Sequence, residues 1–272
     1  MNKKITIIGC GWLGLPLGIH LVEKGLSVRG TTTSKEKLQE LDKAGINGTV
    51  LSLGHNFDEN WGDLLDADVV VVTLPPSVAP QDPEMPLRQI REAISHSKCQ
   101  RLIYTSATSV YPSVNGKVTE KDAKYIESPH SGVEMLSLED VFTDSDGFDT
   151  TVLRLAGLVG GSRMPGRRSA GKKLSNGGAP MNLVHREDVV NAIAQVISQD
   201  DFGDVYNVCA DMHPTRKEFY TAVAEKLNLE SPTFEDEEKG SYKIVSNVKI
   251  KEQLGLVFGA ILRKSDFEKV TS

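Results

Sequence analysis

Short runs of β-branched residues alternate with amphipathic stretches through the first 160 positions of the chain. This alternation is typical of a parallel sheet whose strands are joined by helical crossovers. The run DVVVVTL at 68–74 is almost continuously apolar, as a strand must be when helices cover both faces of its sheet, so we expect it at the sheet centre. The predicted strands are 4–8, 26–32, 49–53, 68–74, 101–106 and 150–156, and the predicted helices are 12–24, 34–44, 84–98 and 128–143.

The pattern changes after residue 156, where a stretch rich in Gly, Arg and Ser shows no periodicity up to residue 180. A loop of that length in a compact domain is usually functional or disordered. Helical periodicity returns at 189–197, and a short strand is predicted at 204–208. Thr215 and Glu218 have the spacing of a capping box, which predicts the start of a further helix.

Two of the predicted helices begin with residues suited to a helix start. Ser34 is placed as an N-cap, and Ser128 is followed by Pro129, whose missing N–H costs nothing at the first helical position. Together the elements predict an α/β protein with a Rossmann-type doubly wound parallel sheet and a small C-terminal substrate lobe. The predicted NAD(P)-binding domain is 1–156 with 185–210, and the predicted substrate lobe is 157–184 with 211–272.

A glycine fingerprint lies between the first predicted strand and the first predicted helix. Gly9, Gly11 and Gly14 form GxGxxG within ITIIGCGWLGLPLG. The first glycine permits a tight turn, the second lets the backbone approach a pyrophosphate, and the third lets helix and strand pack closely. The free N–H groups of the helix start complete an anion site. We therefore predict dinucleotide binding by this segment, with Trp12 and Leu13 included, and the alternative is a turn made only for packing.

The residues after the second predicted strand bear on the choice of cofactor. NAD sites usually place a carboxylate there to accept hydrogen bonds from the ribose 2′-OH. Here the positions are Thr31, Thr32, Thr33 and Ser34, followed by Lys35, which can donate to a 2′-phosphate. The sequence thus favours NADP(H) over NAD(H), although Lys35 also fits a solvated helix face and use of both cofactors stays open.

Composition excludes several classes of function. The net charge of −6 and the pI near 5.6 give no basic surface for nucleic acid or an anionic membrane. Cys10, Cys99 and Cys209 are far apart and lack the spacing of a metal or redox motif, so no metal is expected. No run approaches the roughly 18 apolar residues that cross a bilayer, and we expect a cytoplasmic protein.

Three further motifs carry a family resemblance: YTSATSVY at 104–111, LRLAGLVGG at 153–161 and NLVHREDVVNAI at 182–193. In this order, and over nearly the whole chain, the sequence resembles the extended short-chain dehydrogenases/reductases. It is especially similar to their atypical, NAD-dependent epimerase/dehydratase-like members of the YeeZ-like subgroup. The resemblance implies an NAD(P)-binding oxidoreductase or epimerase/dehydratase that acts on a small polar or nucleotide-sugar-like substrate.

The usual active site of that family is incomplete in this sequence. The family uses a tyrosine acid/base, a lysine four residues later, and a serine or threonine that binds the substrate oxygen. No YxxxK occurs anywhere in the chain. The serine position falls on Ala107, between Ser106 and Thr108, and Pro129 and Val133 stand where the tyrosine and lysine are expected. Losing one positioned donor costs roughly 10²- to 10³-fold in rate, so ordinary family catalysis would be badly impaired.

Other residues are candidates for the missing proton donor. His130 has an unperturbed pKa suited to proton transfer near neutrality, although a histidine at a helix start is often simply exposed. Glu134 lies one helical turn further on. Tyr111, Ser106 and Thr108 are weaker substitutes. The catalytic prediction is therefore a non-standard site drawn from these five residues.

The long loop carries an excess of positive charge. Arg163, Arg167 and Arg168 fall where the family places substrate contacts, and guanidinium groups suit phosphate or carboxylate. A flexible charged surface loop is the alternative. His185 is expected to line the substrate pocket or to cap a helix. By resemblance and by their place after strands, the remaining cofactor contacts are assigned to Leu74, Pro75, Pro76, Ala107, Leu155, Ala156 and Gly157.

Two functions follow from these observations. The first is an oxidoreductase or epimerase with a non-standard proton donor and an anionic small-molecule substrate. The second is a non-catalytic NAD(P)-binding sensor or regulatory protein, suggested by the joint absence of YxxxK and of the family serine. A homodimer stays open, and the substrate is not identified by the sequence.

Overall fold

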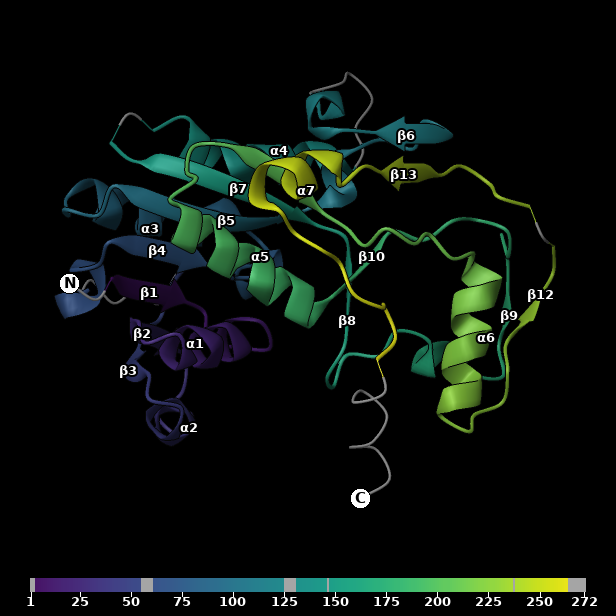
Figure 1. Ribbon diagram of the computed structural model, residues 1–272, viewed down its shortest axis with the longest axis horizontal. Helices are drawn as coiled ribbons and strands as arrows, with labels where there is room; N and C mark the ends of the chain where they lie inside the picture. Colours follow the sequence, from purple (N-terminus) through teal and green to yellow (C-terminus); the bar gives the residue numbers. More distant parts are fainter. Residues whose placement is uncertain (1–2, 55–60, 125–130, 146, 237, 264–272) are drawn as a thin grey trace. The chain divides into compact units, whose positions relative to one another are not determined.

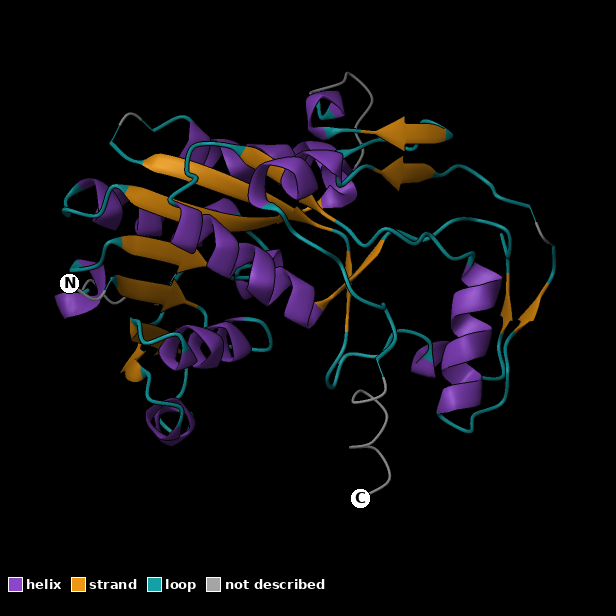
Figure 2. Ribbon diagram, in the orientation of Figure 1, coloured by secondary structure: helices purple, strands orange, loops and turns teal. Residues whose placement is uncertain are grey.

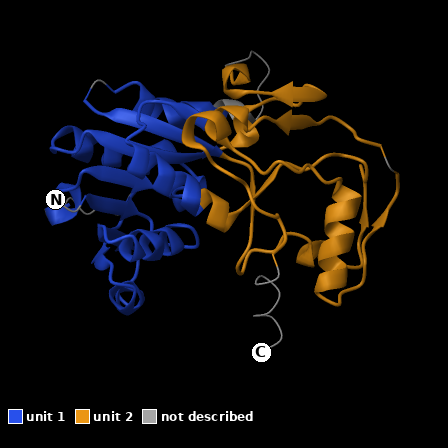
Figure 3. Ribbon diagram, viewed as in Figure 1, with its two compact units in different colours: residues 1–106, 133–154, 190–206 blue, residues 107–132, 155–189, 207–272 orange. Residues whose placement is uncertain are grey.

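The computed structural model describes residues 3–54, 61–124, 131–145, 147–236 and 238–263. Its contacts divide the chain into two compact units, coloured separately in Figure 3. The first unit is Met1–Ser106, Val133–Arg154 and Val190–Tyr206. The second unit is Ala107–Gly132, Leu155–Val189 and Asn207–Ser272. The assignment of substrate binding to the C-terminal lobe remains a prediction.

A seven-stranded sheet dominates the first unit, in the order β11-β7-β5-β4-β1-β2-β3 (Figure 1). β4, the predicted central strand, has three strands on either side, and all four of its residues are buried. The strands are β1 (Lys4–Ile8), β2 (Ser27–Thr32), β3 (Asn47–Val50), β4 (Val69–Val72), β5 (Arg101–Ala107), β7 (Asp149–Leu155) and β11 (Val205–Val208). β1 pairs in parallel with both β2 and β4, so the strand order reverses there. The predicted doubly wound Rossmann-type fold is confirmed.

Helices cover both faces of this sheet, as the colours of Figure 2 show. They are α1 (Gly14–Glu23), α2 (Leu38–Lys43), α3 (Glu84–Ser95), α4 (Ser131–Thr143) and α5 (Arg186–Gln199). Successive side chains of a strand point to opposite faces. A Cβ added at Gly18 of α1 would lie 3.5 Å from Ile7, whereas Ile8 belongs to the core cluster that includes Leu87 of α3 and Phe142 of α4.

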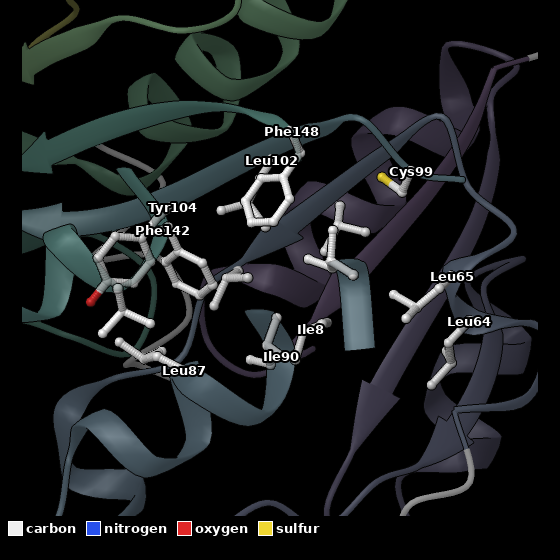
Figure 4. Packing of buried hydrophobic residues seen from close by; sticks show 14 of the residues in the cluster. Ile8, Leu64, Leu65, Leu87, Ile90, Cys99, Leu102, Tyr104, Phe142 and Phe148 are labelled. Carbon is white, nitrogen blue, oxygen red and sulfur yellow. The ribbon is translucent and has the colours of Figure 1, made fainter. Parts of the chain in front are cut away.

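The core beneath α3 and α4 is drawn in Figure 4. Val70 and Val72 of β4 and Leu102 of β5 are fully buried in it. The rings of Tyr104 and Phe142 lie 5.2 Å apart in a tilted arrangement. Burying each large apolar side chain contributes roughly 1.5–3 kcal/mol, so this cluster fixes β4 and β5 as a rigid base for the loops that follow them.

The second unit is built from short elements. Three two-stranded parallel sheets pair β6 with β13, β8 with β10, and β9 with β12. The strands are β6 (Gly116–Val118), β8 (Gly157–Val159), β9 (Lys173–Leu174), β10 (Leu183–His185), β12 (Thr233–Phe234) and β13 (Lys243–Val245), and the helices are α6 (Arg216–Lys226) and α7 (Val248–Leu254). The capping box at α6 is confirmed, because the Glu218 N–H donates to Thr215 Oγ1 and the Thr215 N–H donates to the Glu218 carboxylate.

The structure corrects two predictions about local structure. α2 begins at Leu38, with Lys37 and not Ser34 at the N-cap position, because residues 35–37 form a turn first. The stretch from 157 to 180 contains β8, β9 and a 3₁₀ turn at Arg167–Ser169. Its strands pair with segments distant in sequence, and local periodicity cannot reveal such pairing. The predicted N-cap Ser128 lies outside the described residues.

Among the residues described, no helix combines the length and apolar character needed to span a membrane. Within the same residues there is no group of three or more His, Cys, Asp or Glu side chains arranged to hold a metal ion.

Candidate functional site

The glycine turn after β1 connects the ends of three strands. Gly9 has a φ of 103°, which favours glycine, and its N–H donates to Thr31 Oγ1 of β2 at 2.9 Å. The Gly9 carbonyl accepts a hydrogen bond of 2.7 Å from Thr73 Oγ1, just after β4. Thr73 had no role in the sequence analysis, and its position one residue beyond a buried strand was the available signal. The turn therefore lies at the switch point between β1 and β4, where open α/β sheets bind ligands.

The other two fingerprint glycines differ in what surrounds them. A Cβ at Gly14 would lie 2.2 Å from the Gly9 carbonyl oxygen, so only glycine lets α1 begin this close to the turn. A Cβ at Gly11 would meet no atom within 4 Å, and the residue is exposed. The turn therefore leaves open space over its backbone, beside the start of α1. This arrangement fits a dinucleotide whose pyrophosphate lies against the backbone and the helix N-terminus.

The remaining fingerprint residues and the end of β4 lie around this turn. Leu13 is buried, whereas Trp12 is half-buried. A Cβ at Gly9 would lie 2.9 Å from Leu74 Cδ2, so Leu74 packs directly on the turn. Pro75 and Pro76 are exposed, and a 3₁₀ turn begins at Pro76. The structure thus brings together the predicted contacts from the ends of β1, β2 and β4.

The residues after β2 fall into two groups. Thr31 and Thr32 are buried, and Thr31 supports the glycine turn. Thr33 and Lys35 are exposed, and Ser34 is half-buried. Glu36, which no motif in the sequence singles out, accepts hydrogen bonds from its own N–H and from the Ser34 hydroxyl, and these hold its pKa below the usual value. The nearest carboxylate after β2 is therefore already engaged by Ser34, while Thr33 and Lys35 face solvent.

Ser106 at the end of β5 belongs to a buried polar cluster of the first unit. Its Oγ donates to Glu139 Oε1 of α4 at 2.5 Å. Arg154 of β7 donates to the same carboxylate through Nε at 3.0 Å and Nη2 at 2.7 Å. Burial and the Glu139 charge raise the pKa of the neighbouring Tyr104 phenol. The Ser106 hydroxyl is thus bound to the Glu139–Arg154 ion pair, which the sequence pattern did not predict.

Thr108 and Tyr111 lie in the second unit, on the segment that follows β5. Both are buried, and the Tyr111 N–H donates to the Thr108 carbonyl at 3.3 Å. The Tyr111 hydroxyl donates to Asn207 Oδ1 at 2.6 Å, and Asn207 Nδ2 donates to the Ser246 carbonyl at 3.0 Å. The phenol therefore serves an internal contact, which makes it a weak candidate for proton transfer to a substrate.

The other catalytic candidates are Glu134 and His130, and Ala107 stands between two of those already described. His130 lies outside the described residues. Glu134 is exposed on the first turn of α4, in the first unit. Ala107 is half-buried at the end of β5. The catalytic roles of His130, Glu134, Ser106, Thr108 and Tyr111 remain predictions.

The predicted substrate loop begins against a buried histidine. His185 is 1% exposed, and its Nδ1 accepts the Glu187 N–H at 3.2 Å. A Cβ at Gly160 would lie 2.4 Å from His185 Nε2, so the loop backbone lies directly on the ring. Arg163 and Arg167, by contrast, are exposed. His185 thus supports the loop, and the arginines are the accessible groups.

The predicted nicotinamide segment follows β7, in the second unit. Leu155 and Ala156 are buried, and Gly157 is exposed. The Ala156 N–H donates to the Val208 carbonyl at 3.0 Å, and the Gly157 N–H donates to the Asn182 carbonyl at 3.0 Å. The backbone of this segment is therefore held in place, and its cofactor contacts remain predictions.

Comparison with known proteins identifies the family. Residues 9–200 match the NAD(P)H-binding family. Protein YeeZ of Escherichia coli (strain K12) is 36% identical over 264 residues, which cover 94% of this chain and 96% of that protein. The chain belongs to this NAD(P)H-binding family.

Solved structures share the fold over the full length. UDP-N-acetylglucosamine 4-epimerase from Bacillus cereus matches with a TM-score of 0.78 at 18% identity, covering 100% of both chains. UDP-glucuronic acid 4-epimerase from Bacillus cereus, in complex with UDP-glucuronic acid and NAD, matches with a TM-score of 0.75 at 18% identity, covering 98% of this chain and 97% of that one. At these identities the likeness establishes the Rossmann-type fold.

Family membership confirms the predicted class and NAD(P) binding. The sequence contains no YxxxK, and the placement of Ala107 at the serine position of the short-chain dehydrogenases/reductases remains a prediction.

Proposed function

We propose that the protein is a pyridine-nucleotide-dependent oxidoreductase or epimerase/dehydratase with a non-standard active site. Its substrate is a small polar or nucleotide-sugar-like molecule. The observation that carries the proposal is the open glycine turn at the β1/β4 switch point, where Gly11 leaves the backbone accessible and Gly14 brings α1 against it.

The residues around the turn have separate tasks in this proposal. Backbone N–H groups of the turn and of the start of α1 bind the pyrophosphate. Leu74 and Trp12 contact the bound nucleotide. The cofactor supplies the hydride acceptor or donor, and the chain supplies binding, orientation and proton transfer.

NADP(H) is the preferred cofactor in this proposal. Thr33 and Lys35 are exposed after β2, and both can donate to a 2′-phosphate. Glu36 is engaged by Ser34 and by its own N–H, which keeps that carboxylate away from the ribose 2′-OH.

The substrate's anionic group is bound by cationic side chains of the second unit. Arg163 and Arg167 are exposed in the 157–184 segment, and a guanidinium binds phosphate or carboxylate oxygens in a bidentate manner. The solved neighbour that holds UDP-glucuronic acid supports a substrate of that chemical type.

The deciding experiment titrates NADPH and NADH separately and follows energy transfer from tryptophan to the reduced nicotinamide. Trp12 lies inside the fingerprint, and a Trp61→Phe variant removes the second tryptophan. We expect saturable transfer at micromolar NADPH and a weaker response to NADH. Absence of binding for both cofactors would reject the proposal.

A second candidate function is a non-catalytic NAD(P) sensor. The observation that favours it is that the hydroxyls of Ser106 and Tyr111 are both committed to internal hydrogen bonds. A cofactor-loaded protein that exchanges no hydride with a broad panel of carbonyl compounds and sugar nucleotides would support the sensor. Turnover of any member would support the enzyme.

A further inference from the structure

Lys243 is a half-buried lysine on β13 of the second unit. Its Nζ donates a hydrogen bond to the Tyr111 carbonyl oxygen. Burial lowers the pKa of its ammonium group, with no charged neighbour among the causes. A positive charge is thus kept in a partly desolvated position, which is unfavourable unless a compensating group is present.

Lys173 and Lys251 of this unit have carboxylate partners. Lys251 Nζ lies 2.8 Å from Asp211 Oδ1, and Lys173 Nζ lies 3.2 Å from Glu235 Oε1. For Lys243, no carboxylate of the described chain lies within ion-pair distance. An ammonium group has three donors, and the Tyr111 carbonyl accepts one of them. The remaining donors suit a ligand oxygen that carries negative charge.

The backbone around Lys243 is held firmly. Asn182 Nδ2 donates to the Lys243 carbonyl at 2.9 Å, and Asn182 Oδ1 accepts the Val245 N–H at 2.8 Å. β13 also pairs with β6, where Lys243 faces Gly116. The charged side chain is therefore presented from a fixed strand, which reduces the entropy lost when it binds a ligand.

The position of Lys243 connects it to the predicted catalytic segment. Tyr111, whose carbonyl it contacts, is joined to Thr108 through a backbone hydrogen bond. We propose that Lys243 is an anion-binding residue of the substrate site, where its ammonium contacts a phosphate or carboxylate oxygen of the substrate beside the Thr108–Tyr111 segment. The inference rests on the proposed function and adds a specificity-determining residue to it.

The test compares Lys243→Met with Lys117→Met. Lys117 is exposed on the neighbouring strand β6, so it matches the change in charge without the burial. Binding is measured by calorimetry with saturating NADPH, using UDP as the anionic probe and uridine as its neutral counterpart. We expect Lys243→Met to weaken UDP binding about tenfold to hundredfold, as for loss of a hydrogen bond to a charged group, with uridine unaffected. Lys117→Met should bind UDP like the wild type.

Three further measurements identify which anionic group Lys243 binds and guard against a folding defect. If Lys243→Met loses affinity for both UDP-glucose and UDP-glucuronic acid, Lys243 binds the diphosphate. If it loses affinity for UDP-glucuronic acid alone, Lys243 binds the carboxylate. In the wild type, UDP should protect Lys243 from acetic anhydride and leave Lys117 reactive, as read by mass spectrometry. Lys243→Arg should retain most of the affinity.

The inference is overturned if folded Lys243→Met binds UDP, UDP-glucose and UDP-glucuronic acid all as tightly as the wild type, if neither UDP nor UDP-glucuronic acid protects Lys243, or if the wild type binds none of the three nucleotides. Tryptophan energy transfer to NADPH, measured on the same samples, shows whether the proposed function fails as well. If NADPH binds and Lys243 has no effect, the proposed function stands without this residue.

Discussion

The Ser106 hydroxyl donates a hydrogen bond to Glu139 Oε1 at 2.5 Å, which joins the end of β5 to the middle of α4. Arg154 of β7 donates to both oxygens of this carboxylate, so three elements of the first unit meet at one buried ion pair. Such a pair contributes little net stability when intact, because desolvation offsets the attraction, yet breaking it is costly. The cluster fixes the strand end from which the Thr108–Tyr111 segment begins.

The first prediction concerns this ion pair. Arg154→Met leaves the Glu139 charge buried without its partner and should lower the free energy of unfolding by about 3–5 kcal/mol. Ser106→Ala leaves the pair intact and should cost about 1.5–3 kcal/mol. Urea unfolding followed by circular dichroism measures both. A double variant, Glu139→Leu with Arg154→Met, should regain most of the loss, and equal costs for Arg154→Met and Ser106→Ala would contradict this account.

The second prediction separates binding from folding in the fingerprint. Gly11→Ala adds a methyl group to open space, so stability should stay within about 0.5 kcal/mol of the wild type. The same methyl group lies where the nucleotide backbone approaches, and NADPH affinity should fall at least about tenfold. Gly14→Ala meets the Gly9 carbonyl and should lose about 1–3 kcal/mol of stability as well.

Thermal melts and NADPH titration of the same samples make the comparison. Gly147→Ala is the control, because a Cβ there also meets nothing within 4 Å and the residue lies far along the chain from the fingerprint. Normal NADPH binding by Gly11→Ala would show that this face of the turn is not the nucleotide site.

The sequence pattern located the central strand because β4 is a continuous apolar run, and it is buried at all four positions. The limits of α2 were wrong because Ser34 bonds Glu36 in a turn and so does not cap the helix. β8 and β9 were missed because they pair with β10 and β12, which are distant in sequence, and a short stretch of sequence carries no signal for such pairing.

Some residues of the candidate site could be predicted from a local motif, whereas others depend on contacts between distant parts of the chain. The glycine turn is local, so its residues could be read directly from GxGxxG. The contact of Ser106 with Glu139 spans 33 residues, and that of Lys243 with Tyr111 spans 132. Both depend on the tertiary fold. A charged residue inside the buried run of β7, such as Arg154, was the available hint that a partner existed.

The third prediction tests the cofactor preference. Lys35→Glu replaces an exposed donor with a carboxylate, which should repel a 2′-phosphate and accept hydrogen bonds from a 2′-OH. NADPH affinity should fall about tenfold to hundredfold, with NADH affinity unchanged or improved. Lys43→Glu, at the exposed end of α2, is the control, because it changes the net charge by the same amount. An equal loss for both cofactors would argue against phosphate contact at Lys35.

The fourth prediction decides the role of Tyr111. Tyr111→Phe removes the hydroxyl that donates to Asn207 and leaves a buried amide oxygen short of one donor. An internal role predicts a loss of about 1–3 kcal/mol in unfolding free energy, with cofactor and UDP binding retained. Asn207→Asp keeps an acceptor for the phenol but loses the Nδ2 donor to the Ser246 carbonyl and buries a carboxylate, so it should cost more stability than Tyr111→Phe. A variant of wild-type stability that has lost all turnover would instead identify Tyr111 as the proton donor.

The last prediction is a pH dependence of stability that originates at His213 in the second unit. Burial lowers the pKa of this imidazole below its usual 6.5, and the Lys117 charge adds to the effect, while the Met181 carbonyl and Asp211 oppose it. The unfolded chain therefore binds a proton at a higher pH than the folded chain does. The stabilising contribution is fully present above pH 6.5 and is lost as the pH falls toward the folded pKa, with a slope of at most about 1.4 kcal/mol per pH unit.

His213→Gln should flatten the profile of unfolding free energy below pH 6.5, and Lys117→Gln should reduce its slope by raising the folded pKa. A His213→Gln profile parallel to that of the wild type would show that the imidazole titrates alike in both states.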